Sequence, residues 1–253
     1  MIAHLAHPTL PGTRILVPDD WLLVDDVFAA QMAARDRLLT EAPSHVVCQH
    51  RSACPAASEA LAFICDALAD VDGYTQQNGA MRRPDGVVVQ LDPDNPMGTI
   101  GHLIQEDICL LQKQGSEHIL TAGVVCFPAH WTLGEKLMRP LSVIHNPVAE
   151  YDANIASRVQ RLFDGIQVGR PLWRMNLNPC DTAEIHTPRS EHEPERAPIL
   201  PPPYIRAERQ CLVRLPKTRA MLFSIHTYML DAARLDPQIA THLSGWFSRP
   251  DVR

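Results

Sequence analysis

The chain has little that would let it bind nucleic acid, hold an iron–sulfur cluster or cross a membrane. Its 253 residues carry a formal net charge of −6, with lysines and arginines scattered along the sequence, whereas a nucleic-acid-binding domain normally has a clustered basic surface. None of the seven cysteines forms a C-x-x-C pair, which excludes the usual zinc and iron–sulfur spacings. No apolar run approaches the roughly 20 residues of a membrane span. We therefore expect neither a nucleic-acid partner nor a membrane.

Familiar signatures of export and catalysis are also missing. The first eight residues, Met-Ile-Ala-His-Leu-Ala-His-Pro, lack the basic start and apolar core of a signal peptide. Most cysteines stand among apolar residues, which is typical of a reducing compartment, so we expect a cytoplasmic protein. There is no Walker loop, G-x-S-x-G, G-x-G-x-x-G or H-E-x-x-H motif, and no flavin or ferredoxin element. If the chain performs oxygen chemistry, its electrons come from another polypeptide.

The order of apolar patterns predicts an α+β fold. We predict helices over 20–42, 55–71, 101–113, 151–166 and 231–247, strands over 117–127, 204–215 and 219–229, and short extended pieces around 84–91. Helices and mostly antiparallel strands in mixed order are typical of α+β proteins. With 45% hydrophobic residues, the chain can form one domain over 1–253. Residues 178–203, rich in Pro, Glu, Arg and His, are either an ordered functional loop or a disordered one.

Several unusual clusters follow one another between residues 105 and 228. They are Gln-Glu-Asp-Ile (105–108), Cys-Phe-Pro-Ala-His-Trp (126–131), Gly-Glu-Lys-Leu (134–137), Ile-His-Asn-Pro-Val (144–148), Trp-Arg-Met-Asn (173–176), Ile-Arg-Ala-Glu-Arg-Gln-Cys-Leu-Val-Arg-Leu-Pro (205–216) and Thr-Tyr (227–228). In this order they resemble the α subunit of haem-dependent oxidative N-demethylases, the dimethylamine-monooxygenase family, over about residues 15–240.

The resemblance implies a PAS-like antiparallel sheet with additional helices that form a pocket for haem b. It also implies that a small secondary amine such as dimethylamine is oxidised by O2 to a primary amine and formaldehyde. NAD(P)H would supply the electrons through a separate flavin and iron–sulfur reductase. Two alternatives stay open, a haem-based gas or redox sensor of PAS type and a haem-free interaction subunit. Whether the chain forms a homo-oligomer also stays open.

His145 is the histidine that this resemblance indicates as the axial ligand of the haem iron. It stands between apolar residues, and Pro147 favours an extended Asn146, which gives a stiff and apolar backbone beside the imidazole. The alternative is a core or loop histidine that bonds the backbone. Four other histidines compete for the role: His102, His118, His130 and His226. The family usually carries arginine at the position of His226, which argues against a shared ligand role there.

Asp107 and Glu106 are the carboxylates that we expect near the chemistry. On the predicted helix 101–113, Asp107 projects into the apolar stripe with Leu103 and Leu111, and Glu106 lies at its edge. A buried carboxylate must be paired, hydrogen-bonded or functional. It either bonds loop amides or an arginine, or it binds the substrate ammonium or delivers protons.

Arginines on strands are candidates for holding the haem propionates. On the strand predicted over 204–215, Arg206 and Glu208 are two residues apart and therefore share one face, while Arg209 points to the opposite face. The planar guanidinium matches a carboxylate, and Arg174 between Trp173 and Met175 offers the same chemistry. Lys136 is a weaker candidate of the same kind. A solvated strand face is the alternative interpretation.

Overall fold

A computed structural model describes residues 12–17, 20–144, 153–194, 199–239 and 243 of the chain. Its main sheet has seven antiparallel strands in the order β1-β8-β9-β10-β6-β7-β2, and a second sheet has three in the order β3-β4-β5. The strands of the main sheet are β1 Arg14–Ile15, β2 Val47–Gln49, β6 Asp107–Gln114, β7 Glu117–Val124, β8 Leu172–Cys180, β9 Tyr204–Arg214 and β10 Met221–Asp231. The small sheet consists of β3 Thr75–Gln77, β4 Ala80–Arg82 and β5 Val88–Gln90. The predicted α+β class is confirmed.

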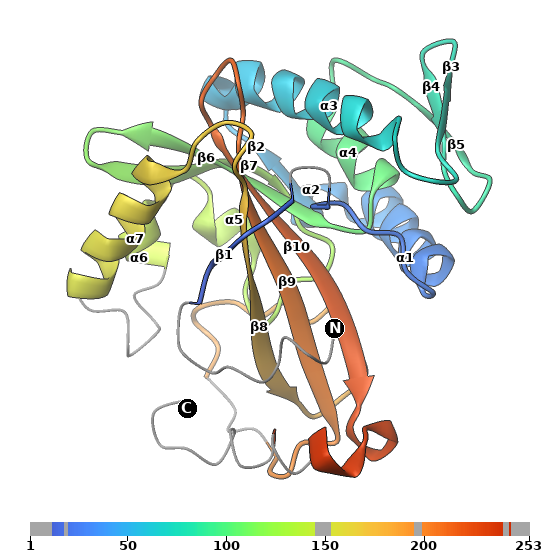
Figure 1. Ribbon diagram of the computed structural model, residues 1–253, viewed down its shortest axis with the longest axis vertical. Coiled ribbons are helices and arrows are strands. Elements are labelled where there is room, and N and C mark those ends of the chain that lie inside the picture. The colour runs from blue at the N-terminus through green and yellow to red at the C-terminus, as the bar shows by residue number, and fades with distance from the viewer. Residues whose placement is uncertain (1–11, 18–19, 145–152, 195–198, 240–242, 244–253) are drawn as a thin grey trace.

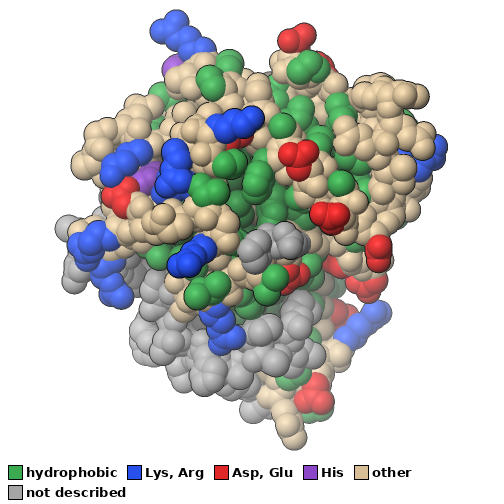
Figure 2. All heavy atoms as spheres, turned by 45° about the horizontal axis from the view of Figure 1, so that its top comes forward, with side chains coloured by type: hydrophobic (Ala, Val, Ile, Leu, Met, Phe, Trp, Pro, Cys, Tyr) green, Lys and Arg blue, Asp and Glu red, His purple; other side chains and the backbone are tan. Residues whose placement is uncertain are grey.

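The helices lie on both faces of the main sheet (Figure 1). They are α1 Phe28–Glu41, α2 Pro43–Val46, α3 Cys54–Leu68, α4 Pro96–Leu103, α5 Leu133–Lys136, α6 Leu141–Ile144 and α7 Ala153–Gly165, with short 3-10 turns at Arg51–Ala53 and Ala232–Arg234. None of the helices in the described part of the chain is long and apolar enough to cross a membrane. On the side of the molecule seen in Figure 2, most basic side chains lie on the left and most acidic ones on the right, with apolar side chains between them and no continuous basic surface.

Alternate residues of the long strands enter two separate cores. Cys211 and Leu222 pack in the core that contains α1, α3 and α4. Leu212 and Met221 pack instead in a core with Phe163 of α7. Because successive strand residues point to opposite faces, we name these the α1 face and the α7 face. The strand alternation then assigns the other side chains of β9 and β10 to a face.

Close packing joins α4 to the sheet at Gly101. A Cβ atom at this position would lie 2.7 Å from Val124 Cγ2 of β7 and 3.0 Å from Leu39 Cδ1 of α1. A side chain there would force its neighbours apart. The helix α4 therefore ends directly against the strands, and the chain turns from Leu103 into β6 within three residues.

Most predicted elements are present, but one prediction was wrong. The hairpin 204–215 and 219–229 and the helices 55–71 and 151–166 correspond to β9, β10, α3 and α7. The predicted helix 101–113 is instead the end of α4 followed by β6. The first five residues of β6 are buried between β7 and β10, so their sequence shows no alternation that would separate a strand from a helix.

Smaller differences occur at the ends of elements. The helix predicted from residue 20 begins at Phe28, because residues 20–25 bond other parts of the chain instead. The strand β8 was not predicted, and the loop predicted over 178–203 begins only after Cys180. Within the C-terminal helix predicted over 231–247, the described residues form a 3-10 turn at Ala232–Arg234 and a helical segment at 237–239, while residues 240–242 and 244–247 lie outside the described part of the chain.

Candidate functional site

Asp107 is the first residue of β6, and both of its carboxylate oxygens are hydrogen-bonded. Oδ1 accepts from Arg35 Nη1 at 2.6 Å and from the backbone N–H of Cys126 at 2.7 Å, while Oδ2 accepts from Phe127 N–H at 2.9 Å. Both Asp107 and Arg35 are buried, and the guanidinium lies over the Phe127 ring at 5.4 Å. Of the two interpretations of Asp107, these contacts correspond to the carboxylate that bonds loop amides and an arginine.

Arg35 was not identified from the sequence, although a signal was present. Phe28, Met32, Arg35 and Leu39 follow one another at helical spacing and are all buried on α1. An arginine within an apolar stripe requires a partner, because an isolated buried charge is very costly. The partner, Asp107, lies 72 residues later in the chain, and no local pattern connects the two.

The backbone of Phe127 connects Asp107 to a second polar group, which is centred on Arg206 of β9. The N–H of Phe127 donates to Asp107, and its carbonyl accepts from Arg206 Nη2. Arg206 also donates to the carbonyl of Ile185 at 2.9 Å and, through Nε, to Glu208 Oε1 at 2.8 Å. All donor nitrogens of Arg206 therefore have acceptors within the protein.

From Arg206 a row of polar side chains continues across the α7 face. Gln210 Nε2 donates to Glu208 Oε2 at 2.9 Å, and Arg174 Nε of β8 donates to Gln210 Oε1 at 2.7 Å. Arg174 lies directly opposite Gln210 in the pairing of β8 with β9. The predicted alternation of Arg206 and Glu208 on one strand face is confirmed, and the face is buried instead of solvated. We call Arg174, Gln210, Glu208 and Arg206 the polar row.

Glu106 takes part in a different buried cluster, on the α1 face. Its Oε1 accepts from the backbone N–H of Leu23 at 2.9 Å and lies 2.9 Å from His226 Nδ1. His226 Nε2 lies 3.3 Å from Asp25 Oδ2, so the imidazole is placed between two carboxylates. These carboxylates hold the pKa of His226 at about 9, above the ordinary value, against the opposing effect of burial. The cluster fixes residues 20–27 on the sheet.

The structure therefore does not bring all predicted site residues together. Arg174, Arg206 and Glu208 share the α7 face, while Glu106 lies with His226 on the opposite face. Asp107 lies at the start of β6, between the two groups, and is connected to the polar row through Phe127. His145 lies outside the described residues, directly after α6.

The competing histidines have different surroundings. His118 is buried, and its Nδ1 lies 2.8 Å from Gln160 Oε1 of α7. His130 adopts a positive φ of 59° in the turn after β7, and its backbone N–H donates to the carbonyl of Thr187. His102 of α4 is half-buried, and its Nδ1 lies 2.7 Å from Asp36 Oδ1.

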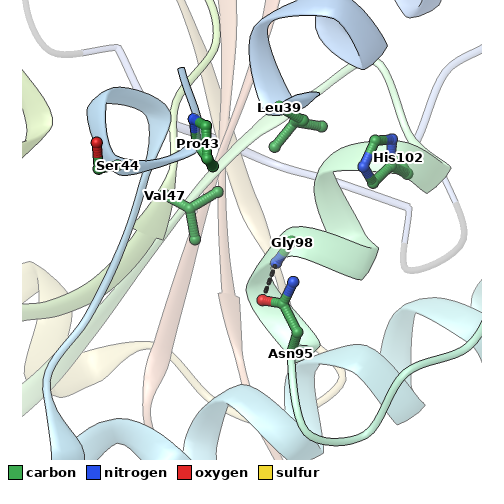
Figure 3. A pocket seen from close by; sticks show the side chains of 7 residues that line it. All are labelled: Leu39, Pro43, Ser44, Val47, Asn95, Gly98 and His102. Atoms are coloured by element: carbon green, nitrogen blue, oxygen red, sulfur yellow. Dashed lines mark hydrogen bonds between the residues drawn. The ribbon is translucent and has the colours of Figure 1, made fainter. Parts of the chain in front are cut away.

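A cavity of about 260 Å³ lies between α1, α2 and α4. Figure 3 shows His102 of α4 and Ser44 of α2 on opposite sides of this cavity, with Leu39 and Val47 between them. The cavity is smaller than the roughly 300–1,000 Å³ of ordinary ligand pockets. It contains no residue of the polar row, and we do not assign it to the site.

The contacts of Asp107 predict that its charge stabilises the fold. In Asp107→Asn, the new amide nitrogen would face N–H donors that now bond a carboxylate oxygen. Arg35 would remain buried without its counter-charge. We expect the free energy of unfolding to fall by about 3–5 kcal/mol, the cost of breaking a buried ion pair. Urea unfolding followed by circular dichroism measures the change.

Asp164→Asn is the matched control for this substitution. The N–O distance between Lys113 and Asp164 is 2.7 Å, close to the 2.6 Å between Arg35 and Asp107. Both side chains of the control pair, however, are more than 40% exposed. An exposed pair contributes about 0–1 kcal/mol, so the control should remain close to wild type. Equal effects of the two substitutions would contradict the structural role of Asp107.

The raised pKa of His226 predicts how the free energy of unfolding depends on pH. Its folded pKa of about 9 exceeds the value of about 6.5 in an unfolded chain. The stabilisation by the protonated ring is therefore complete below about pH 6.5 and is lost as the pH rises through 9. Glu106 and Asp25 face the ring, and Arg209 and Tyr228 are its other polar neighbours.

We expect the free energy of unfolding to fall between pH 6.5 and 9 with a slope of at most about 1.4 kcal/mol per pH unit. In His226→Gln this slope should disappear. Urea unfolding at a series of pH values compares the two proteins, and an unchanged slope in the variant would assign the pH dependence to another group.

A comparison with known protein families matches a family model to most of the chain. The family described as haem-dependent oxidative N-demethylase, alpha subunit-like, matches residues 12–245. This range includes β1 to β10, the polar row and the Asp107 contacts. The match covers most of the 253 residues, so the chain belongs to the haem-dependent oxidative N-demethylase alpha subunit-like family.

Proposed function

We propose that the chain is the haem-binding subunit of an oxidative N-demethylase that acts on a small secondary amine such as dimethylamine. Its family is named for haem dependence and oxidative N-demethylation. The observation that carries the proposal within the structure is Arg174, at the open end of the polar row.

Arg174 has donors available for an anion. Among the described residues its guanidinium makes one hydrogen bond, from Nε to the neutral amide of Gln210. Burial lowers the pKa of the guanidinium, and the negative charge of Glu208 offsets this only in part. A carboxylate brought by a ligand would bond the remaining donors and compensate for the lost hydration. The donor chemistry therefore fits a haem propionate.

The other residues of the polar row orient Arg174 instead of binding the ligand themselves. Glu208 fixes the amide of Gln210, and Gln210 fixes Arg174 Nε. Arg206 holds Glu208 and is itself held by two backbone carbonyls, those of Ile185 and Phe127. A ligand-binding group that is held in this way loses little conformational entropy when the ligand arrives.

His145 is the proposed axial ligand of the haem iron. It directly follows Ile144, the last residue of α6, and its assignment rests on the Ile-His-Asn-Pro-Val cluster. We assign supporting roles to the two carboxylates. Asp107 holds the turn at Cys126 and Phe127 in place for Arg206, and Glu106 holds His226 and residue Leu23.

Bound haem would supply the reduction of O2 and the oxidation of an N-methyl group. The overall reaction consumes the secondary amine, O2, two electrons and two protons, and it releases the primary amine, formaldehyde and water. The electrons would come from NAD(P)H through a flavin and iron–sulfur reductase on another polypeptide. The chain itself would bind the cofactor, orient it and exclude water from the site.

Formaldehyde release tests this function. The haem-loaded protein, supplied with NADH and a reductase that donates single electrons, should convert dimethylamine to methylamine and formaldehyde in equal amounts. A protein that binds haem but releases no formaldehyde from any small methylated amine would instead fit the sensor alternative.

The role of Arg174 predicts weaker haem binding when it is replaced. Arg174→Ala should lower haem affinity by about 1–3 kcal/mol, the cost of losing a charge-assisted hydrogen bond. Arg170→Ala is the control, because Arg170 is exposed and lies outside the polar row. Titration followed by the Soret absorption measures both. An affinity of Arg174→Ala equal to that of the control would assign Arg174 to the fold alone.

A further inference from the structure

His186 has an imidazole ring whose tautomer is fixed by its surroundings. Its Nδ1 lies 2.7 Å from the backbone carbonyl oxygen of Cys126. A carbonyl oxygen only accepts hydrogen bonds, so Nδ1 carries a proton, and in the neutral ring Nε2 is the acceptor nitrogen. The residue is half-buried, and among the described residues no group bonds Nε2. Nε2 is also not one of the fully buried polar atoms. It therefore presents a lone pair that a small donor can reach.

The segment 181–194 contains this histidine and is fixed beside the turn that follows β7. Thr187 N–H and Oγ1 donate to the carbonyl of Pro128. Ser190 Oγ donates to Glu135, whose pKa is lowered to about 2 mainly by its hydroxyl hydrogen bonds. These polar contacts favour the ordered loop over the disordered one, and they give the imidazole a defined position.

Arg206 connects His186 to the polar row. Its Nη1 donates to the carbonyl of Ile185 at 2.9 Å, and its Nη2 donates to the carbonyl of Phe127. Ile185 directly precedes His186 in the sequence. Phe127 directly follows Cys126, to whose carbonyl the imidazole donates. The imidazole therefore belongs to the same hydrogen-bonded group as Arg206.

Arg174 and Arg206 mark the two ends of the polar row. Arg174 pairs with Gln210 across the strands, and Gln210 is four residues from Arg206 on β9. At about 3.3 Å per strand residue, the two ends are about 13 Å apart. A porphyrin that is bound through a propionate at Arg174 can extend along this length. A second, small ligand at its other side would then meet His186.

The amine of the proposed reaction needs an acceptor that the predicted carboxylates do not provide here. A secondary amine has an N–H donor in both its free and its protonated form. Both oxygens of Asp107 already accept hydrogen bonds, and so do both oxygens of Glu208. Glu106 lies with His226 on the opposite face of the sheet. In the described part of the chain, Nε2 of His186 is an acceptor without a donor beside the polar row.

We propose that His186 is a substrate-binding residue whose Nε2 accepts a hydrogen bond from the N–H of a small secondary amine. The inference rests on the proposed function and names the group that holds its substrate. When the amine arrives as an ammonium ion, its proton passes to Nε2. The N–H bond of the ammonium breaks, an N–H bond forms at Nε2, and the amine keeps the electron pair. The carbonyl of Cys126 continues to accept from Nδ1 and stabilises the charged ring.

Two substitutions separate the two nitrogens of the ring. His186→Asn keeps an N–H donor at the position of Nδ1, so the bond to Cys126 persists while Nε2 is lost. His186→Gln keeps an acceptor at the position of Nε2 and loses the bond to Cys126. Dimethylamine binding should weaken about tenfold or more in His186→Asn, the scale of one hydrogen bond to a charged group. In His186→Gln it should stay within about threefold of the wild type, because the acceptor is retained.

Calorimetric titration of the haem-loaded proteins with dimethylammonium chloride measures the amine affinity. A separate Soret titration with iron protoporphyrin IX measures haem binding, which should be equal in the wild type and in both variants, because Arg174 is unchanged. His192→Asn is the matched control, since His192 is an exposed histidine on the same segment. This control should bind haem and dimethylamine as the wild type does.

The outcomes distinguish this inference from the proposed function. Wild-type protein that takes up no haem, or that takes up haem and binds no dimethylamine, would overturn both. Wild-type binding of both ligands with an unchanged amine affinity in His186→Asn would overturn this inference alone. If His186→Asn does not fold, His186→Gln is compared with His186→Leu, which also loses the bond to Cys126. The amine affinity should then be about tenfold lower in His186→Leu than in His186→Gln, and equal affinities would overturn the inference.

Discussion

The buried carboxylate of Asp107 is the contact on which the arrangement of the site depends. It joins three parts of the chain that are distant in sequence: the start of β6, Arg35 of α1 and the turn at Cys126 and Phe127. The same turn accepts a hydrogen bond from Arg206, so Asp107 is connected through this turn to the polar row. The buried carboxylate is stable because three N–H donors bond it. Each of these donors would be costly to bury without an acceptor.

The two faces of the main sheet have different roles. On the α1 face, His226 between Glu106 and Asp25 fixes residues 20–27 over the core. On the α7 face, the polar row ends in Arg174, whose guanidinium makes one hydrogen bond among the described residues. The side chains of one hairpin, β9 and β10, thus hold the fold on one side and offer a charged site on the other, as strand alternation permits.

The sequence predicted those parts whose information is local. The β9–β10 hairpin, α3 and α7 follow from apolar periodicity, and the shared face of Arg206 and Glu208 follows from alternation. The region of Asp107 could not be predicted in this way, because a strand buried on both faces has no alternation. Arg35 stood in an apolar stripe where it required a partner, but its partner is set by tertiary contact. The role of His145 as the axial ligand was predicted from the resemblance and stays a prediction.

The haem content of the wild-type protein tests the central claim most directly. Protein produced with a supply of haem should retain one haem per chain after gel filtration and show a Soret band. On the same protein, His145→Ala should lose the band or shift it, since an axial imidazole determines the spectrum. A wild-type protein that folds, elutes as one species and neither retains nor takes up haem would contradict the account.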